Sequence, residues 1–230
     1  MSPLNKRILR PALALVAALG LSACASVDSV AYKVPEPATR AAPVASTLDP
    51  SVDRTLPFAS PALNVIAINV TVPESLKVSE ANRFLPRGDI VWREDPIGNR
   101  YEQVKTIVTA GLTQGVAGFE GERDVVLDVV VTKFHALTEK ARYTVGGVHA
   151  IQFNLVVRDA ATGETLIGPR QIKADFDALG GQAAIAAEAR GVTQKVRITN
   201  QLAYVIQQEL GQPGGYVERD TGLIGAMNQI

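Results

Sequence analysis

Cysteine is almost absent from this sequence, which excludes one common way of stabilising a small extracytoplasmic domain. The 230 residues include a single cysteine, Cys24, so no disulfide can form within the chain. Histidine is nearly as scarce, with two residues, and two imidazoles without cysteine partners are a poor basis for a metal site. The fold must therefore be held together by packing and hydrogen bonds.

Aromatic residues and an excess of one charge are also lacking. Phe, Trp and Tyr make up 5% of the sequence, whereas hydrophobic residues as a whole make up 47%. We therefore expect a core of Val, Ile, Leu and Ala. Lys and Arg total 23, as do Asp and Glu, for a formal net charge of zero. Because proteins that bind nucleic acids normally carry a basic excess, we expect no nucleic-acid partner.

Only one long apolar run occurs, close to the start of the chain. It extends from Pro11 to Leu21, follows a short basic segment without acids, and is followed by small residues. The run is too short to span a bilayer, which needs roughly 20 apolar residues. A basic segment, a short apolar segment and a small-residue exit are typical of a secretory signal peptide.

The lone cysteine stands directly after this run. The segment Leu21-Ser22-Ala23-Cys24 resembles the lipobox of bacterial lipoproteins at every position. The resemblance implies cleavage between Ala23 and Cys24, and acylation of Cys24 by chains such as palmitate. Each buried methylene contributes about 0.8 kcal/mol, so two or three acyl chains anchor a protein where one would be marginal. Ala25 follows in place of an aspartate, which by the same resemblance implies the outer membrane, facing the periplasm.

The rest of the chain divides into a tether, one domain and a tail. In residues 24–61, prolines recur among Ala, Ser and Thr without periodicity, which predicts a semi-extended spacer after the 1–23 signal. Residues 62–211 carry the regular apolar patterns and form the predicted domain. Residues 212–230 are predicted to be a weakly ordered tail.

Apolar periodicity within the domain predicts four strands and two helices. The strands are expected at 63–72, 123–137, 143–159 and 164–176, and the helices at 99–121 and from Ile185 to Leu210. The order strand, helix, strand, strand, strand, helix predicts an α+β domain. In it, two helices cover one face of a mostly antiparallel sheet of about four strands.

Some positions carry more specific expectations. Asn99 is predicted to cap the first helix, and Gly111 and Gly115 to let that helix lie close against the sheet. Gly168-Pro169 predicts a bulge or an edge in the last strand. The polar face of strand 143–159 should meet water; its members are Ala150, Gln152, Asn154 and Arg158.

Candidate catalytic residues are few. His135 and His149 are expected to be diagonal neighbours on consecutive strands, but no HxxxH, HxH or cysteine accompanies them. GxSxG, P-loop and GxGxxG motifs do not occur. Two same-face carboxylate pairs are equally ordinary on a solvated strand: Asp124 with Asp128, and Asp175 with Asp177. We therefore expect no enzyme, no metal and no cofactor.

The only tryptophan lies in the charged segment before the first helix. If exposed, Trp92 would suit contact with a partner protein, together with the neighbouring Arg93. The alternative is a Trp92 folded over the edge of the sheet. Trp92 and Arg93 are thus the candidate partner-contact residues.

The lipobox, the proline-rich tether and three segments of the domain together resemble an uncharacterised family of alphaproteobacterial lipoproteins, known as a domain of unknown function. The three segments are DIVWREDPIGNRYEQV, DVVLDVVVTKF and FNLVVRDAATGETL. The order of elements is also similar to that of periplasmic lipoproteins that assist lipopolysaccharide assembly, transport or curli secretion. Architecture of this kind does not imply function.

Three functional hypotheses follow. The first is a membrane-anchored, non-enzymatic accessory protein of envelope assembly or transport that binds an envelope protein. The second is a carrier of a small apolar ligand or lipid, which predicts a cavity of several hundred Å³ between helices and sheet. The third, a metal-dependent hydrolase, requires that His135 and His149 meet.

Overall fold

A computed structural model of the chain describes residues 62–219. The predicted signal peptide, the lipobox at Cys24 and the tether of residues 24–61 lie outside this part, as do the last residues of the predicted tail. The described residues cover the predicted domain, 62–211, and the first part of the predicted tail, 212–219.

Six strands and four helices make up residues 62–219. The strands are β1 (Leu63–Thr71), β2 (Ile90–Val91), β3 (Arg123–His135), β4 (Gly147–Asp159), β5 (Thr165–Lys173) and β6 (Phe176–Ala178). The helices are α1 (Arg100–Val116), α2 (Glu139–Arg142), α3 (Gly181–Glu188) and α4 (Gln194–Gly211). In this part of the chain, no helix combines the length and the hydropathy that crossing a membrane requires.

The strands form a mixed sheet in the order β1-β3-β4-β5. β4 pairs antiparallel with β3, β5 and the short β6, whereas β1 and the short β2 pair parallel with β3. Parallel neighbours need a long crossover connection, and the chain makes one through α1 between β1 and β3. The predicted α+β class is confirmed, with a sheet that is mixed.

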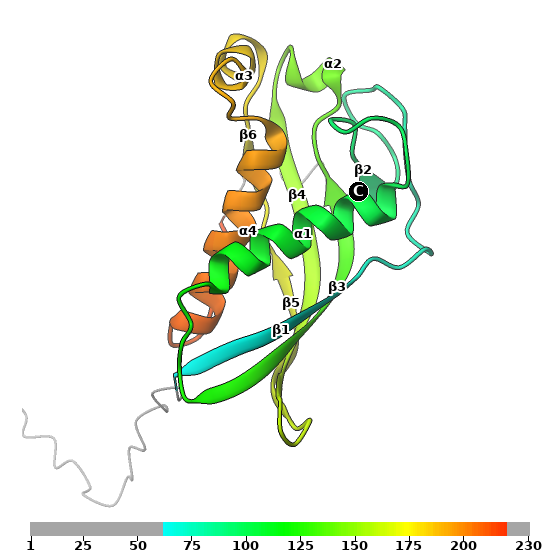
Figure 1. Ribbon diagram of the computed structural model, residues 1–230. Helices are drawn as coiled ribbons and strands as arrows, with labels where there is room; N and C mark the ends of the chain where they lie inside the picture. Colours follow the sequence, from blue (N-terminus) through cyan, green and yellow to red (C-terminus); the bar gives the residue numbers. More distant parts are fainter. Residues whose placement is uncertain (1–61, 220–230) are drawn as a thin grey trace, which may run out of the picture. The chain divides into compact units, whose positions relative to one another are not determined.

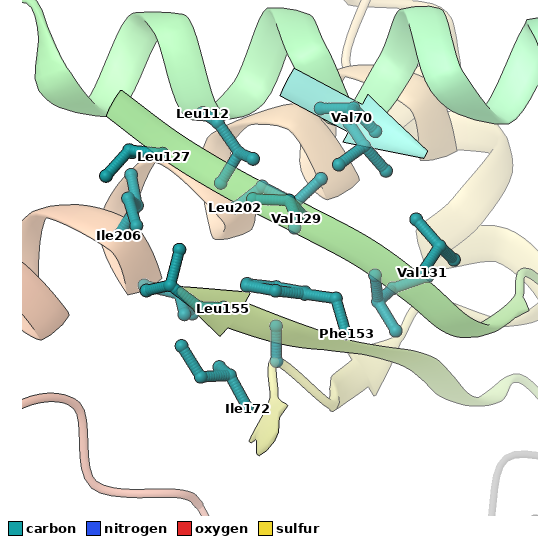
Figure 2. Packing of buried hydrophobic residues seen from close by; sticks show 14 of the residues in the cluster. Val70, Leu112, Leu127, Val129, Val131, Phe153, Leu155, Ile172, Leu202 and Ile206 are labelled. Carbon is teal, nitrogen blue, oxygen red and sulfur yellow. The ribbon is translucent and has the colours of Figure 1, made fainter. Parts of the chain in front are cut away.

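Helices α1 and α4 lie across one face of the sheet (Figure 1). Their apolar side chains and those of β3 and β4 form one cluster, in which Leu112, Leu202 and Ile206 from the helices are fully buried near Val129 and Phe153 of the strands (Figure 2). The space between the helices and the sheet is therefore filled by aliphatic side chains, as the composition predicts.

The start of α1 is confirmed, but the role predicted for its glycines is wrong. The Asn99 side chain accepts hydrogen bonds from the backbone N–H groups of Tyr101 and Glu102, at 3.0 and 3.3 Å, as an N-cap does. Gly111 and Gly115 let α1 lie close against α4, whereas they were predicted to let it lie close against the sheet. A Cβ on Gly115 would lie 2.3 Å from the backbone oxygen of Ala203.

The single long helix predicted from Ile185 to Leu210 is also wrong, because the chain breaks into α3 and α4. Gly191 adopts a left-handed φ of 76° between them, and the Thr193 side chain then caps α4 by accepting from the backbone N–H of Val196. The apolar residues assigned to the first part of the stripe are exposed: Ile185, Val192 and Val196. Apolar spacing alone did not distinguish one helix from two.

The third and fourth predicted strands are shorter than expected. Four residues of the predicted turn form α2, so β4 begins at Gly147, and the last strand divides into β5 and β6. The bulge predicted at Gly168-Pro169 is confirmed by a register shift against β4 between Leu155 and Val157. Ala150 and Gln152, expected to face water, are buried, and the Gln152 side chain donates to the Asp175 carboxylate at 3.2 Å.

Candidate functional site: an apolar hollow beside α2

Trp92 is fully buried. The prediction that it is exposed and available to a partner protein is therefore wrong, and the ring is folded into the domain. Its ring packs edge-to-face on Phe134, with centroids 5.8 Å apart. Its Nε1–H donates to the Asp95 carboxylate at 2.8 Å. The neighbouring Arg93 is engaged as well, since its Nε donates to Glu139 at 2.6 Å. Both candidate contact residues thus hold the segment before α1 in place.

The two histidines lie on opposite faces of the sheet. His135 pairs across the ladder with Ala150, so His149, one residue earlier on β4, points to the other side. The His149 ring packs on Phe176 at 4.9 Å between centroids. Residues 62–219 also contain no cluster of three or more His, Cys, Asp or Glu that could hold a metal ion. The hydrolase hypothesis loses the shared site that it required.

The His149 ring is expected to make the domain less stable in acid. Burial, assisted by the positive charges of Arg197 and Arg142, lowers the pKa of His149 to about 3, whereas an unfolded histidine has a pKa near 6.5. Between these values the unfolded state binds a proton that the folded state excludes, so the free energy of unfolding falls as the pH falls from about 6.5 towards 3. From pH 7.5 to 5, this group should remove about 2 kcal/mol.

Urea denaturation followed by Trp92 fluorescence measures this loss. His149→Phe keeps a ring against Phe176 but cannot titrate, so its free energy of unfolding should depend less on pH. Burial also lowers the pKa of His135, which adds a loss of the same sign in both proteins. An equal pH dependence in the wild type and the variant would show that His149 is not the group responsible.

Three of the four paired carboxylates are engaged in hydrogen bonds within the domain. Asp124 and Asp128 accept hydrogen bonds from Asn64 and Asn69 of β1, at 2.8 and 2.9 Å. Of the other pair, Asp175 is buried and accepts hydrogen bonds from the backbone N–H of Ile151 at 2.9 Å and from the side chain of Gln152 at 3.2 Å. Asp177 is exposed. These carboxylates connect neighbouring strands and do not converge on one site.

A hollow beside α2 at the end of β3 was not predicted from the sequence. It has a volume of about 340 Å³ and is lined by residues 84–86, 135–138 and 145–148; we call it the apolar hollow. Its volume falls within the range of about 300–1,000 Å³ typical of small-molecule sites. The three lining segments flank β2, α2 and β4, and no single stretch of sequence reveals that they meet.

Hydrogen bonds to backbone atoms fix one wall of the apolar hollow. The hydroxyl of Thr138 donates to the backbone oxygen of Arg83 at 2.7 Å, and the backbone N–H of Lys140 donates to the Asn82 side chain at 2.8 Å. His135 Nε2 lies 2.6 Å from the backbone oxygen of Gly88; since a carbonyl oxygen can only accept, this nitrogen carries the proton. Segment 82–88 is thus attached at both ends, and the hollow is preformed.

The rim of the apolar hollow exposes large apolar side chains. Phe84 is 46% exposed, Leu85 56% and Val145 77%. Single exposed apolar residues are normal, but a cluster around a concavity is typical of a binding site. The sequence contains weak signals of it, namely the adjacent Phe84 and Leu85 within a loop, and Val145 before two glycines.

Residues 63–226 match the model of the Family of unknown function DUF6778. The chain belongs to DUF6778. The prediction of a domain of unknown function is thereby confirmed, whereas the alphaproteobacterial and lipoprotein character of the family stays a prediction for this member.

Two solved structures resemble this DUF6778 domain at a distance. One, named "putative lipoprotein" and from Caulobacter crescentus CB15, is 15% identical, with a TM-score of 0.33 over 62% of this chain and 86% of that one. The other, an uncharacterised protein, is 18% identical, with a TM-score of 0.34 over 65% of this chain and 92% of that one. Likenesses this distant carry no argument about function. No curated protein matches the sequence.

Proposed function

We propose that this DUF6778 protein is a lipid-anchored protein of the cell envelope whose domain is a non-enzymatic binding module. Cys24 supports the anchor, because it directly follows a signal-like apolar run. The apolar hollow is the observation that supports binding, because it is preformed and exposes apolar side chains at its rim. The two histidines that could have formed a shared catalytic site lie on opposite faces of the sheet. On this account, the domain acts as an accessory in envelope assembly or transport.

The proposal places the domain in the periplasm, on the outer membrane. Ala25 supports this location, since a lipoprotein with aspartate after its cysteine would be retained at the inner membrane by the sorting rule that the lipobox resemblance implies. Separation of inner and outer membranes, followed by detection of the protein, tests the choice of membrane.

A second candidate function is carriage of a small apolar ligand. The cavity predicted between helices and sheet is not there, because Leu112, Leu202 and Ile206 fill that space. The apolar hollow supplies a cavity of the predicted size on another part of the domain. The location predicted for the ligand, between helices and sheet, was therefore wrong. The carrier hypothesis now rests on the apolar hollow.

Replacing Cys24 with serine is expected to abolish membrane anchoring. Serine lacks the thiol that acyl chains require, so labelled palmitate should not enter the protein and most of it should leave the membrane fraction. Ser22→Ala is the matched control, because it keeps a small residue in the lipobox and leaves the thiol intact. Equal palmitate labelling and membrane recovery in wild type and Cys24→Ser would contradict the anchor.

A photoreactive amino acid in place of Leu85 tests the binding role in intact cells. The same substitution at Ile97 is the control, because Ile97 is 92% exposed but does not line the apolar hollow. Crosslinks to an envelope component from position 85 alone are expected. Absence of any crosslink from position 85, or the same products from position 97, would count against binding through this surface.

A further inference from the structure

We propose that the apolar hollow binds the hydrocarbon chain of an anionic amphiphile, with the acidic head group at the rim. This rests on the binding role proposed above and names the class of ligand. It applies to a molecule other than the acyl chains attached to Cys24. A fatty acid is the simplest member of the class.

The inner walls of the apolar hollow suit a hydrocarbon chain. The polar side chains that line it, His135 and Thr138, already direct their polar atoms to backbone oxygens of Gly88 and Arg83. Burial lowers the pKa of His135, so its ring is neutral at physiological pH. The lining surface as a whole is mainly apolar, so a polar ligand would find few partners inside.

Three cationic residues beside the lining segments make no ion pair within residues 62–219. Lys140 Nζ lies 4.8 Å from the centre of the Phe84 ring. Arg83 and Arg87 flank lining residues 84–86 in the chain and are exposed. None of the ion pairs in the described part of the chain involves these three cations.

The acidic residues nearest to these cations in the sequence are already engaged. Glu139, next to Lys140, is paired with Arg93 at 2.6 Å. Asp89, close to Arg87, accepts a hydrogen bond from the backbone N–H of Lys77 at 2.8 Å. The local charge balance therefore favours an anion at the mouth of an apolar cavity. The acyl chains predicted on Cys24 carry no acidic head group, so this charge distribution does not favour them as occupants.

Calorimetric titration of the mature chain, residues 24–230 with Cys24→Ser, tests the proposal. The probes are laurate and dodecyltrimethylammonium, which have the same hydrocarbon length and opposite charge, each used below its micelle-forming concentration. One laurate should bind per chain, at least about tenfold more tightly than the cationic probe, a difference equivalent to about 1.4 kcal/mol. Serine at position 24 keeps the outcome independent of whether the native protein is lipidated.

Variants at the rim locate the site. Leu85→Asn and Val145→Asn should each weaken laurate binding about tenfold, whereas Ile97→Asn should not. Lys140→Glu should remove most of the preference for the anionic probe, whereas Arg190→Glu, at an exposed arginine outside the hollow, should not. Leu85 and Val145 line the hollow but are exposed, and the other substituted residues are not among its lining, so Trp92 fluorescence serves to verify that each variant is folded.

Three results with the Cys24→Ser chain would overturn the proposal. The first is that laurate shows no saturable binding, and the second is that the two probes bind with equal affinity. The third is that Val145→Asn and Ile97→Asn weaken laurate binding equally. Laurate binding that disappears when Cys24 carries its own lipid would assign the hollow to the anchor, and would also overturn it. A protein crosslinked at position 85 in cells, together with no laurate binding, would leave the binding role standing and refute the ligand class.

Discussion

Trp92→Ala is expected to lower the free energy of unfolding by about 3–5 kcal/mol, the usual cost of removing a large buried aromatic side chain. The indole is completely buried, packs edge-to-face on Phe134 and donates to Asp95. Its removal leaves a cavity under the segment that leads into α1, and leaves the Asp95 carboxylate without one of its donors. Domains of this size are typically stable by about 5–15 kcal/mol, so a large part of the total would be lost.

Urea denaturation followed by circular dichroism measures this effect, since the variant has no tryptophan left. Trp92→Phe is the matched control, because it keeps an aromatic ring beside Phe134 and loses the N–H donor and part of the volume. It should be clearly more stable than Trp92→Ala. A Trp92→Ala protein as stable as the wild type would mean that Trp92 lies at the surface.

Gly115→Ala is expected to destabilise the domain by about 3 kcal/mol, the upper part of the usual range for overpacking. In an isolated helix the same change would be favourable by about 1 kcal/mol. Here the new methyl would lie 2.3 Å from the backbone oxygen of Ala203 and 2.4 Å from Ile206 Cγ2. Since backbone atoms of α4 cannot move away alone, α1 and α4 must separate, and the clash outweighs the helix propensity.

Gly118→Ala provides the control for this prediction. A Cβ at Gly118 would meet no atom within 4 Å, so the free energy of unfolding should change little. Both variants keep Trp92, and urea denaturation followed by its fluorescence compares them directly. If Gly115→Ala were as stable as Gly118→Ala, the close packing of α1 on α4 would be wrong.

Features with local signals could be predicted from the sequence. The β-branched runs of β3 and β4, the apolar spacing of α1 and the cap at Asn99 are each encoded within a few residues. The direction of β1 could not be predicted, because its sequence is the same whether it pairs parallel or antiparallel with β3. The break between α3 and α4 had a signal in Gly191 and Thr193, but the apolar spacing suggested continuity.

The candidate site could not be predicted from local sequence patterns, because it is formed by segments that are distant in the sequence. The apolar hollow forms where residues 84–86, 135–138 and 145–148 meet, and these segments are brought together by the pairing of β2 with β3 and of β3 with β4. The burial of Trp92 could not be predicted from local sequence either, because its charged sequence neighbours suggested that it is exposed. Those charges are paired with groups distant in sequence, as Arg93 is with Glu139, and so they enclose the indole.

Intact mass spectrometry of the protein extracted from its native cells tests the central claim most directly. The account predicts a chain that starts at Cys24, lacks residues 1–23, and is heavier than its sequence by a diacylglycerol and an additional acyl group. A chain that retains Met1 and the leader, or one that starts at Cys24 with an unmodified thiol, would contradict it.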